Sequence, residues 1–237
     1  KTYDLMEFIS NKRKKEVTML WANMTDPVTV NAYVNNIVSG DFPTDQSDVE
    51  QLKKADILYM PITPFTPNKA GINVEFQHIM SKINLTIELG SEYEFTADVD
   101  KKITDVKIDG SMVEAGYYID FSTEKSPLDF YNYSGDPTPI SPFRTGTKPY
   151  SKTDGKASAT YEAILIPQTI ESGKFTVSFK VDGKLYEWAY NKDLTLASNT
   201  AYTLKLIAGD DKVQPASFSV APWGVGNGKD GEKKETD

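Results

Sequence analysis

His78 is the residue of this chain best suited to acid–base chemistry, because it is the single histidine among 237 residues. A serine hydrolase would have to use this imidazole as its base, but no nucleophile-elbow motif lies near it. Zinc binding is disfavoured as well, since zinc sites need several His or Cys ligands and the chain has no cysteine. His78 instead falls in an alternating pattern beside Phe76 and Met80, which favours a half-buried structural role.

Two other patterns look like ligand-binding loops but are incomplete. Asp98 and Asp100 stand two apart, as in a calcium loop, yet the glycine at the sixth position and the glutamate at the twelfth are missing. The stretch GVGNGKD near the C-terminus lacks the spacing of a phosphate-binding loop and the Ser or Thr that should follow Lys229. The sequence therefore predicts no catalytic residue, no metal ligand and no cofactor site. Paired carboxylates of a glycosidase are set by a distance in space, which no sequence pattern encodes.

The three tryptophans allow two interpretations. Together with the 13 tyrosines, Trp21, Trp188 and Trp223 can form a platform on which sugar rings stack. The alternative, which the sequence favours, is that they pack in the core, and Trp188 already has a place in a hairpin described below.

The charge balance limits the class of partner. The chain carries 34 acidic and 26 basic residues, a net charge of −8 and a pI of about 4.8. Nucleic-acid binding needs clustered Lys and Arg, so we expect no nucleic-acid partner. No run approaches the roughly 18 apolar residues of a membrane-spanning helix.

The stretch from Gly71 to Leu89, GINVEFQHIMSKINLTIEL, predicts a long strand at the centre of the fold. Apolar residues alternate with polar ones, first on even positions and then on odd positions, so the buried face must change sides around residues 78–81. A β-bulge, or a strand that leaves one sheet for another, produces such a change. We therefore expect an all-β sandwich.

A hairpin over residues 174–190 is the clearest local prediction. Asp182-Gly183 fits a two-residue type I′ turn, because glycine tolerates a positive φ. This turn places Phe179 opposite Tyr186, Val177 opposite Trp188 and Phe175 opposite Tyr190, with all six side chains on one face.

Flanking segments complete the expected elements. Val28–Val34 reads as a strand, residues 47–55 as a short helix with Ser47 as its cap and Glu50 reaching back, and residues 56–60 as a short strand. The proline-rich segment 61–71 reads as a connection between domains, and residues 126–156 as a long loop.

The C-terminal part ends in an alternating segment through Phe218 and Val220 to Trp223. This segment is either a donor strand for another molecule or, as we favour, the last strand of its own domain. The Gly-rich, charged tail 224–237 is expected to be disordered and not to act as a donor.

The order of these segments resembles the fimbrillin-like proteins of Bacteroides-type bacteria, in the type V pilin superfamily. The segments are ADILYM, VEFQHIMSKINLTIE, YEAILIPQTI, VDGKLYEW, NTAYTLKL and SFSVAPW. The most telling pieces are a strand with Phe76, His78, Ser81 and Lys82, and the strand end Pro167-Gln168-Thr169. The resemblance covers residues 55 to 223.

The resemblance implies two transthyretin-like, Greek-key β-sandwich domains in tandem. We assign residues 1–70 to an incomplete N-terminal domain and residues 71–223 to the C-terminal domain. We allow the boundary between the two domains to lie as late as residue 90. It also implies an exported lipoprotein precursor, attached to the outer membrane through an N-terminal lipid anchor. Subunits of this family assemble by strand donation, and Arg13 is a candidate site for processing by an Arg-specific protease.

The function that we expect is that of a structural subunit of a cell-surface fimbria, in an accessory or tip-like position, that contributes to adhesion. Its partners would be other pilin subunits and host or bacterial surface glycans or proteins. The alternative is a carbohydrate-binding surface module of the outer membrane, and an enzyme ranks third.

Overall fold

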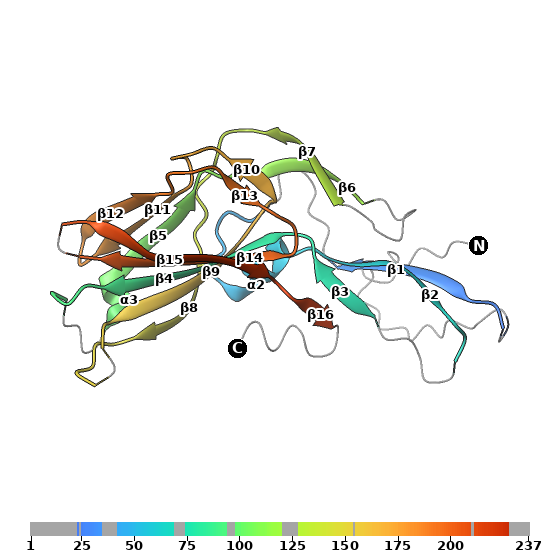
Figure 1. Cartoon of the computed structure of the whole chain (residues 1–237), viewed down its shortest axis with the longest axis horizontal. Coiled ribbons are helices and arrows are strands. Elements are labelled where there is room, and N and C mark those ends of the chain that lie inside the picture. The colour runs from blue at the N-terminus through green and yellow to red at the C-terminus, as the bar shows by residue number, and fades with distance from the viewer. Residues whose placement is uncertain are drawn as a thin grey trace.

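A computed structural model of the chain describes residues 23, 25–34, 42–68, 74–93, 98–119, 128–153, 155–209 and 211–227. These residues form an all-β protein, as predicted, and they include two short helices, of which one was predicted (Figure 1). Arg13 and Trp21 lie outside the described residues. No described helix is long and apolar enough to cross a membrane.

Two sheets form the sandwich. The first has the order β15-β14-β4-β9-β8, with β14 parallel to β4 and every other neighbour antiparallel. Its strands are β15 (Val213–Pro222), β14 (Thr200–Ala208), β4 (Ser81–Leu89), β9 (Ser158–Leu165) and β8 (Phe143–Lys148). The second has the order β12-β11-β5, with β12 (Lys184–Ala189), β11 (Thr176–Val181) and β5 (Ile103–Asp109). Alternate residues of both sheets meet in one hydrophobic core.

Two short strand pairs and a helical turn complete this part of the molecule. They are β6 (Glu114–Ile119) with β7 (Leu128–Ser134), β10 (Gln168–Ile170) with β13 (Leu194–Leu196), and α3 (Val99–Lys102). Asp98, from the incomplete calcium-loop pattern, forms an exposed ion pair with Lys101 at α3.

The predicted hairpin is confirmed. Phe179 pairs with Tyr186 and Val177 with Trp188, while the Tyr190 amide donates to the Phe175 carbonyl at 2.9 Å. Asp182 and Gly183 have φ values of 51° and 86°, as a type I′ turn requires. The register is fixed because a slip by one residue would expose the whole apolar face.

A second sheet system lies at the other end of the molecule's long axis (Figure 1). Its order is β1-β2-β3-β16, with β1 (Val28–Val34), β2 (Leu58–Phe65), β3 (Glu75–His78) and β16 (Val225–Asn227). The chain leaves this sheet after His78 and enters the sandwich at Ser81, with Ile79 and Met80 buried between them. The predicted change of buried face is therefore a strand that passes from one sheet to another.

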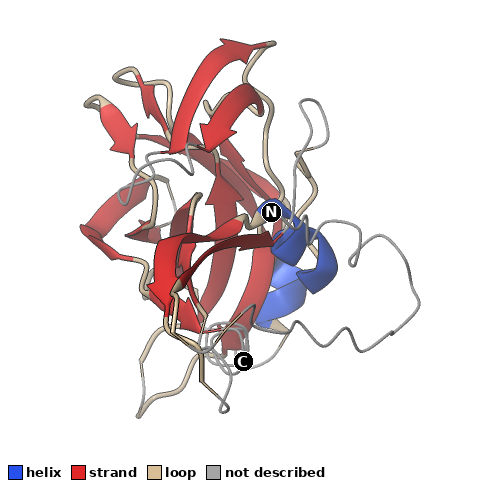
Figure 2. Ribbon diagram, turned by 90° about the vertical axis from the view of Figure 1, so that its right-hand side faces the viewer, coloured by secondary structure: helices blue, strands red, loops and turns tan. Residues whose placement is uncertain are grey.

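Helix α2 (Val49–Ala55) begins two residues later than predicted. Its cap is Asp48, whose carboxylate accepts from the amides of Glu50 and Gln51. The predicted cap Ser47 instead donates its hydroxyl to Asp45. The correction is physically small, because aspartate and serine serve equally well at this position. The helix lies on one flank of the strands (Figure 2) and contacts β9.

Three other predictions are wrong. The segment 61–65 belongs to β2 although it holds Pro61 and Pro64. These prolines are tolerated because β3 pairs only with Leu58 and Tyr59, and because Pro61 falls where the β1–β2 register shifts. The predicted loop 126–156 contains β7 and β8, with its prolines 137, 139, 142 and 149 just outside those strands. The tail is paired as β16 over Val225–Asn227, while residues 228–237 lie outside the described part.

The domain limits 1–70 and 71–223 stay a prediction. The passage from β3 to β4 at residues 78–81 falls inside the interval that we allowed for the boundary, between 71 and 90. Helix α2, which we placed in the first domain, is packed against the sandwich through Leu52 and Ala55.

Candidate functional site: the last strand and the His78–Trp223 junction

The predicted donor or terminal strand is β15. It runs antiparallel to β14 from the Ala208–Val213 pair to the Thr200–Pro222 pair, with one register shift at Lys205–Leu206. The Trp223 amide then donates to the Asn199 carbonyl at 2.9 Å and extends the pairing by one step. In this structure, β15 is paired as the last strand of the sandwich, and its role as a terminal or a donor strand stays a prediction.

Phe218 and Val220 lie on the same parity of β15, yet their surroundings differ. Phe218 is half-buried, with its ring centroid 5.1 Å from that of Tyr190 and 6.2 Å from that of Tyr202. Val220 is 55% exposed, although its partner Tyr202 on β14 is buried. The apolar row of β15 is therefore only partly covered by its own sandwich.

Trp223 is 9% exposed and stacks on His78. The two ring centroids are 3.8 Å apart and the ring planes differ by 6°. Nδ1 of His78 is 2.9 Å from the Asp56 carboxylate, which lies just after α2. The imidazole is more deeply buried than the half-buried position we predicted, and its two contacts join β3, the end of α2 and the end of β15.

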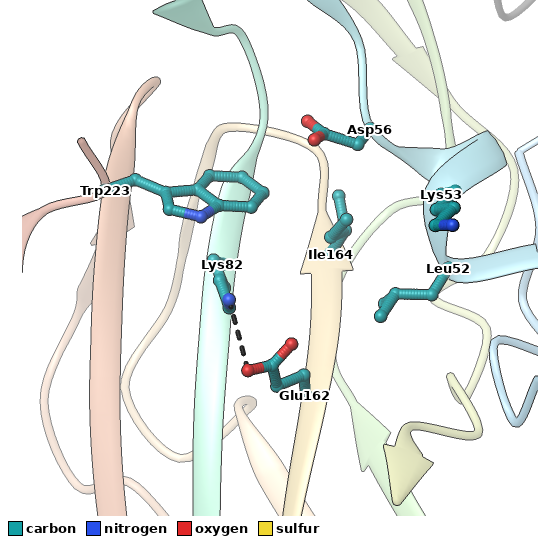
Figure 3. A pocket seen from close by; sticks show the side chains of 7 residues that line it. All are labelled: Leu52, Lys53, Asp56, Lys82, Glu162, Ile164 and Trp223. Atoms are coloured by element: carbon teal, nitrogen blue, oxygen red, sulfur yellow. Dashed lines mark ion pairs between the residues drawn. The ribbon is translucent and has the colours of Figure 1, made fainter. Parts of the chain in front are cut away.

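An ion pair between Lys82 and Glu162 lies near Trp223 (Figure 3). Lys82 Nζ is 3.2 Å from Glu162 Oε1 and 5.5 Å from the centroid of the Trp223 ring. Lys82 comes from β4 and Glu162 from β9, so their pairing connects two neighbouring strands. A cavity of about 40 Å³ lies between these residues, Ile164 and α2. Both charged groups are largely buried, and each has the other as its partner, as buried charges require.

The contacts among His78, Trp223 and Lys82 support a structural role and not a catalytic one. A stacked imidazole and indole hold the end of β15 against the end of β3, and a cation–π contact adds a charged group to the same ring. Among the described residues, no group of three or more His, Asp or Glu side chains is arranged to hold a metal ion. The described part of the chain places Trp223 and Trp188 in or against the core, as we favoured over the sugar platform.

A wider groove of about 610 Å³ lies beside β10. Its central amide, Gln168, exchanges hydrogen bonds with the backbone of Met112 at 2.8 and 3.0 Å. This polar side chain is thus used to join two segments of the fold.

Sequence reasoning found His78 and Trp223 separately but missed their contact. It also missed Asp56, Lys82 and Glu162. Lys82 lies in the SK pair that the resemblance singled out, which is the one signal that pointed toward this cluster. Asp56 and Glu162 come from segments more than one hundred residues apart, and no local spacing links them.

Comparison with known proteins gives a family and a fold. The model of the fimbrillin-like family matches residues 3–223. No curated protein matches the chain in sequence. Among solved structures, a candidate cell adhesion protein from Bacteroides uniformis ATCC 8492 is similar at 18% identity and a TM-score of 0.56, with 84% of this chain and 74% of that one covered. Another, from Bacteroides ovatus ATCC 8483, is similar at 14% identity and a TM-score of 0.50, with 87% of this chain and 65% of that one covered.

Proposed function

Because this chain belongs to the fimbrillin-like family, we propose that it is an accessory or tip-like structural subunit of a cell-surface fimbria that contributes to adhesion. Family membership supports a fimbrial or adhesive role and a structural, non-enzymatic one. The proposal adds two points to what family membership supports: the accessory or tip-like position in the fimbria and the attachment to the outer membrane.

The observation that carries the accessory position is the pairing of β15 and β16 within their own chain. A donor strand must be free to leave its own subunit and offer a period-two row of apolar side chains to a neighbour. Here β15 is bound along β14 and continued by the Trp223 amide. β16 follows at once and pairs with β3. Segment 213–227 is therefore engaged at both of its ends.

The junction at Trp223 supports the same proposal. If β15 left the sandwich, the indole would lose its stack on His78 and its contact with Lys82. The imidazole would then lose the ring that covers it, and the Lys82 ammonium would lose its cation–π contact. Release of the strand thus carries a cost beyond the β14–β15 hydrogen bonds.

The test is the placement of the subunit on fimbriae of cells that express its gene. Immunogold labelling should give sparse particles, at fibre ends or at single positions. A truncation that ends at Gly224 should give the same labelling, because β16 is not a donor in this proposal. Regular labelling along the whole fibre, lost in the truncated variant, would place the subunit in the shaft and refute the accessory role.

A further inference from the structure

The outer edge of β15 has the features of a strand that accepts another strand. The ten residues VQPASFSVAP carry no charge, and among the described residues only β14 pairs with this strand. Within the described ranges, the main-chain groups that point away from β14 therefore have no strand as a partner. Natural proteins usually protect such an edge with charges, prolines or bulges. In β15 the register with β14 skips Ala216, and Pro215 and Pro222 cannot donate, so the regular part of its edge is residues 217–221.

The edge strands β8 and β12 differ from β15 in that they carry charged side chains. β8 carries Arg144 and Lys148, and its pairing with β9 is irregular between Arg144 and Gly146. β12 carries Lys184 and Glu187. Against these strands, β15 stands out as an uncharged edge of a protein whose net charge is −8.

The side chains of β15 suit a copy of the same strand. Phe218 and Val220 form the row that continues toward the core, and the opposite row holds Ser217, Ser219 and Ala221. Both rows are small or apolar, so two antiparallel copies meet without a charge clash on either face. Such a contact is isologous, which means that the same patch of both molecules forms the interface. The assembly therefore closes as a dimer.

We infer that two copies of this chain associate through antiparallel pairing of their β15 strands, with Ser219 at the two-fold axis. This register places Phe218 of one copy opposite Val220 of the other. The half-buried ring and the 55% exposed valine then cover one another. Aromatic and β-branched residues are a favourable cross-strand pair. The two five-stranded sheets become one continuous sheet across the dimer.

Cysteine scanning tests the register directly, because the chain has no cysteine of its own. Residues directly opposite one another in an antiparallel pair have Cα atoms about 4.5–5.5 Å apart, which a disulfide spans. Ser219→Cys should therefore form a covalent dimer under mild oxidation, seen on non-reducing gels. Ser217→Cys is the matched control: it lies opposite Ala221 in the proposed register, so it should remain largely uncrosslinked. Equal crosslinking of both variants would overturn the register.

Sedimentation velocity over a range of concentrations tests the association itself. The wild-type chain should pass from monomer to dimer and stop there. Val220→Lys should weaken the dimer by about tenfold or more, since each symmetric contact is lost twice. Leu185→Lys is the control, because Leu185 is 63% exposed but lies on β12, and it should not change the association.

The possible results separate this inference from the proposed function. A wild-type chain that stays monomeric at every concentration overturns the β15 dimer and leaves the accessory role standing. Open-ended polymers would overturn both, because they would indicate head-to-tail strand donation. Circular dichroism of each variant establishes that a change in association does not come from unfolding.

Discussion

Replacing Trp223 by alanine should destabilise the protein far more than its place at the end of the last sandwich strand would indicate. The indole is 9% exposed and packed against the core. Truncation of a buried tryptophan costs about 3–5 kcal/mol in unfolding free energy. Within this total, the stack on His78 accounts for about 0.5–1.5 kcal/mol, and the Lys82 ammonium for about 0.5–2 kcal/mol.

Urea unfolding followed by far-ultraviolet circular dichroism measures the loss. Trp188→Ala is the matched control, because Trp188 lies on the same core but is only partly buried. It should cost about 1 kcal/mol, which is typical of a point substitution. A double-mutant cycle with His78→Ala should give a coupling energy of about 0.5–1.5 kcal/mol for the stacked rings. A Trp223→Ala loss no larger than that of Trp188→Ala, or a coupling near zero, would refute the junction as a stabilising contact.

Three further predictions concern the sandwich. Phe179→Ala should cost about 3–5 kcal/mol in urea unfolding because its ring is fully buried, whereas Leu185→Ala on the exposed face of the same hairpin should change stability by less than about 0.5 kcal/mol. Gln46→Leu should cost about 1–3 kcal/mol for each backbone group of Ile164 left without its hydrogen bond, and should speed deuterium exchange at the Ile164 amide. Burial raises the pKa of Glu88, but bonds to two lysine ammonium groups outweigh it and the net pKa is lowered. Its stabilising contribution is therefore fully present above the ordinary glutamate pKa of 4.5 and is lost as the pH falls through the lowered pKa, so Glu88→Gln should flatten the acid limb of the stability profile. An unchanged acid limb would contradict this assignment.

Features set by neighbouring residues were predictable from the sequence. The register of the hairpin follows from Asp182-Gly183, because a two-residue turn fixes every pair above it. The passage between sheets at residues 78–81 follows from a change in the alternation of apolar residues. Both depend on local spacing, which the sequence contains in full.

Features set by distant strands were not predictable. Pro61 and Pro64 lie inside β2 because β3 is too short to pair with that half of the strand. Whether prolines are tolerated in β2 thus depends on the neighbouring strand and not on the sequence of β2 itself. Strand β8, with the sequence FRTGTK, has little apolar alternation and exists because β9 holds it. The contacts of Lys82 with Glu162 and Trp223 likewise arise only when β4, β9 and β15 are side by side.

The unbroken chain from β3 into β4 has a mechanical consequence. A pull applied to the sheet that contains β3 enters the sandwich along β4, which is hydrogen-bonded on both sides, to β14 and to β9. Ladder hydrogen bonds lie across the strand direction, so this pull loads both ladders in shear, with all their bonds strained together. A peeling load would break the same bonds one at a time. The fold therefore directs tension from one end of the molecule into the central strand of the five-stranded sheet.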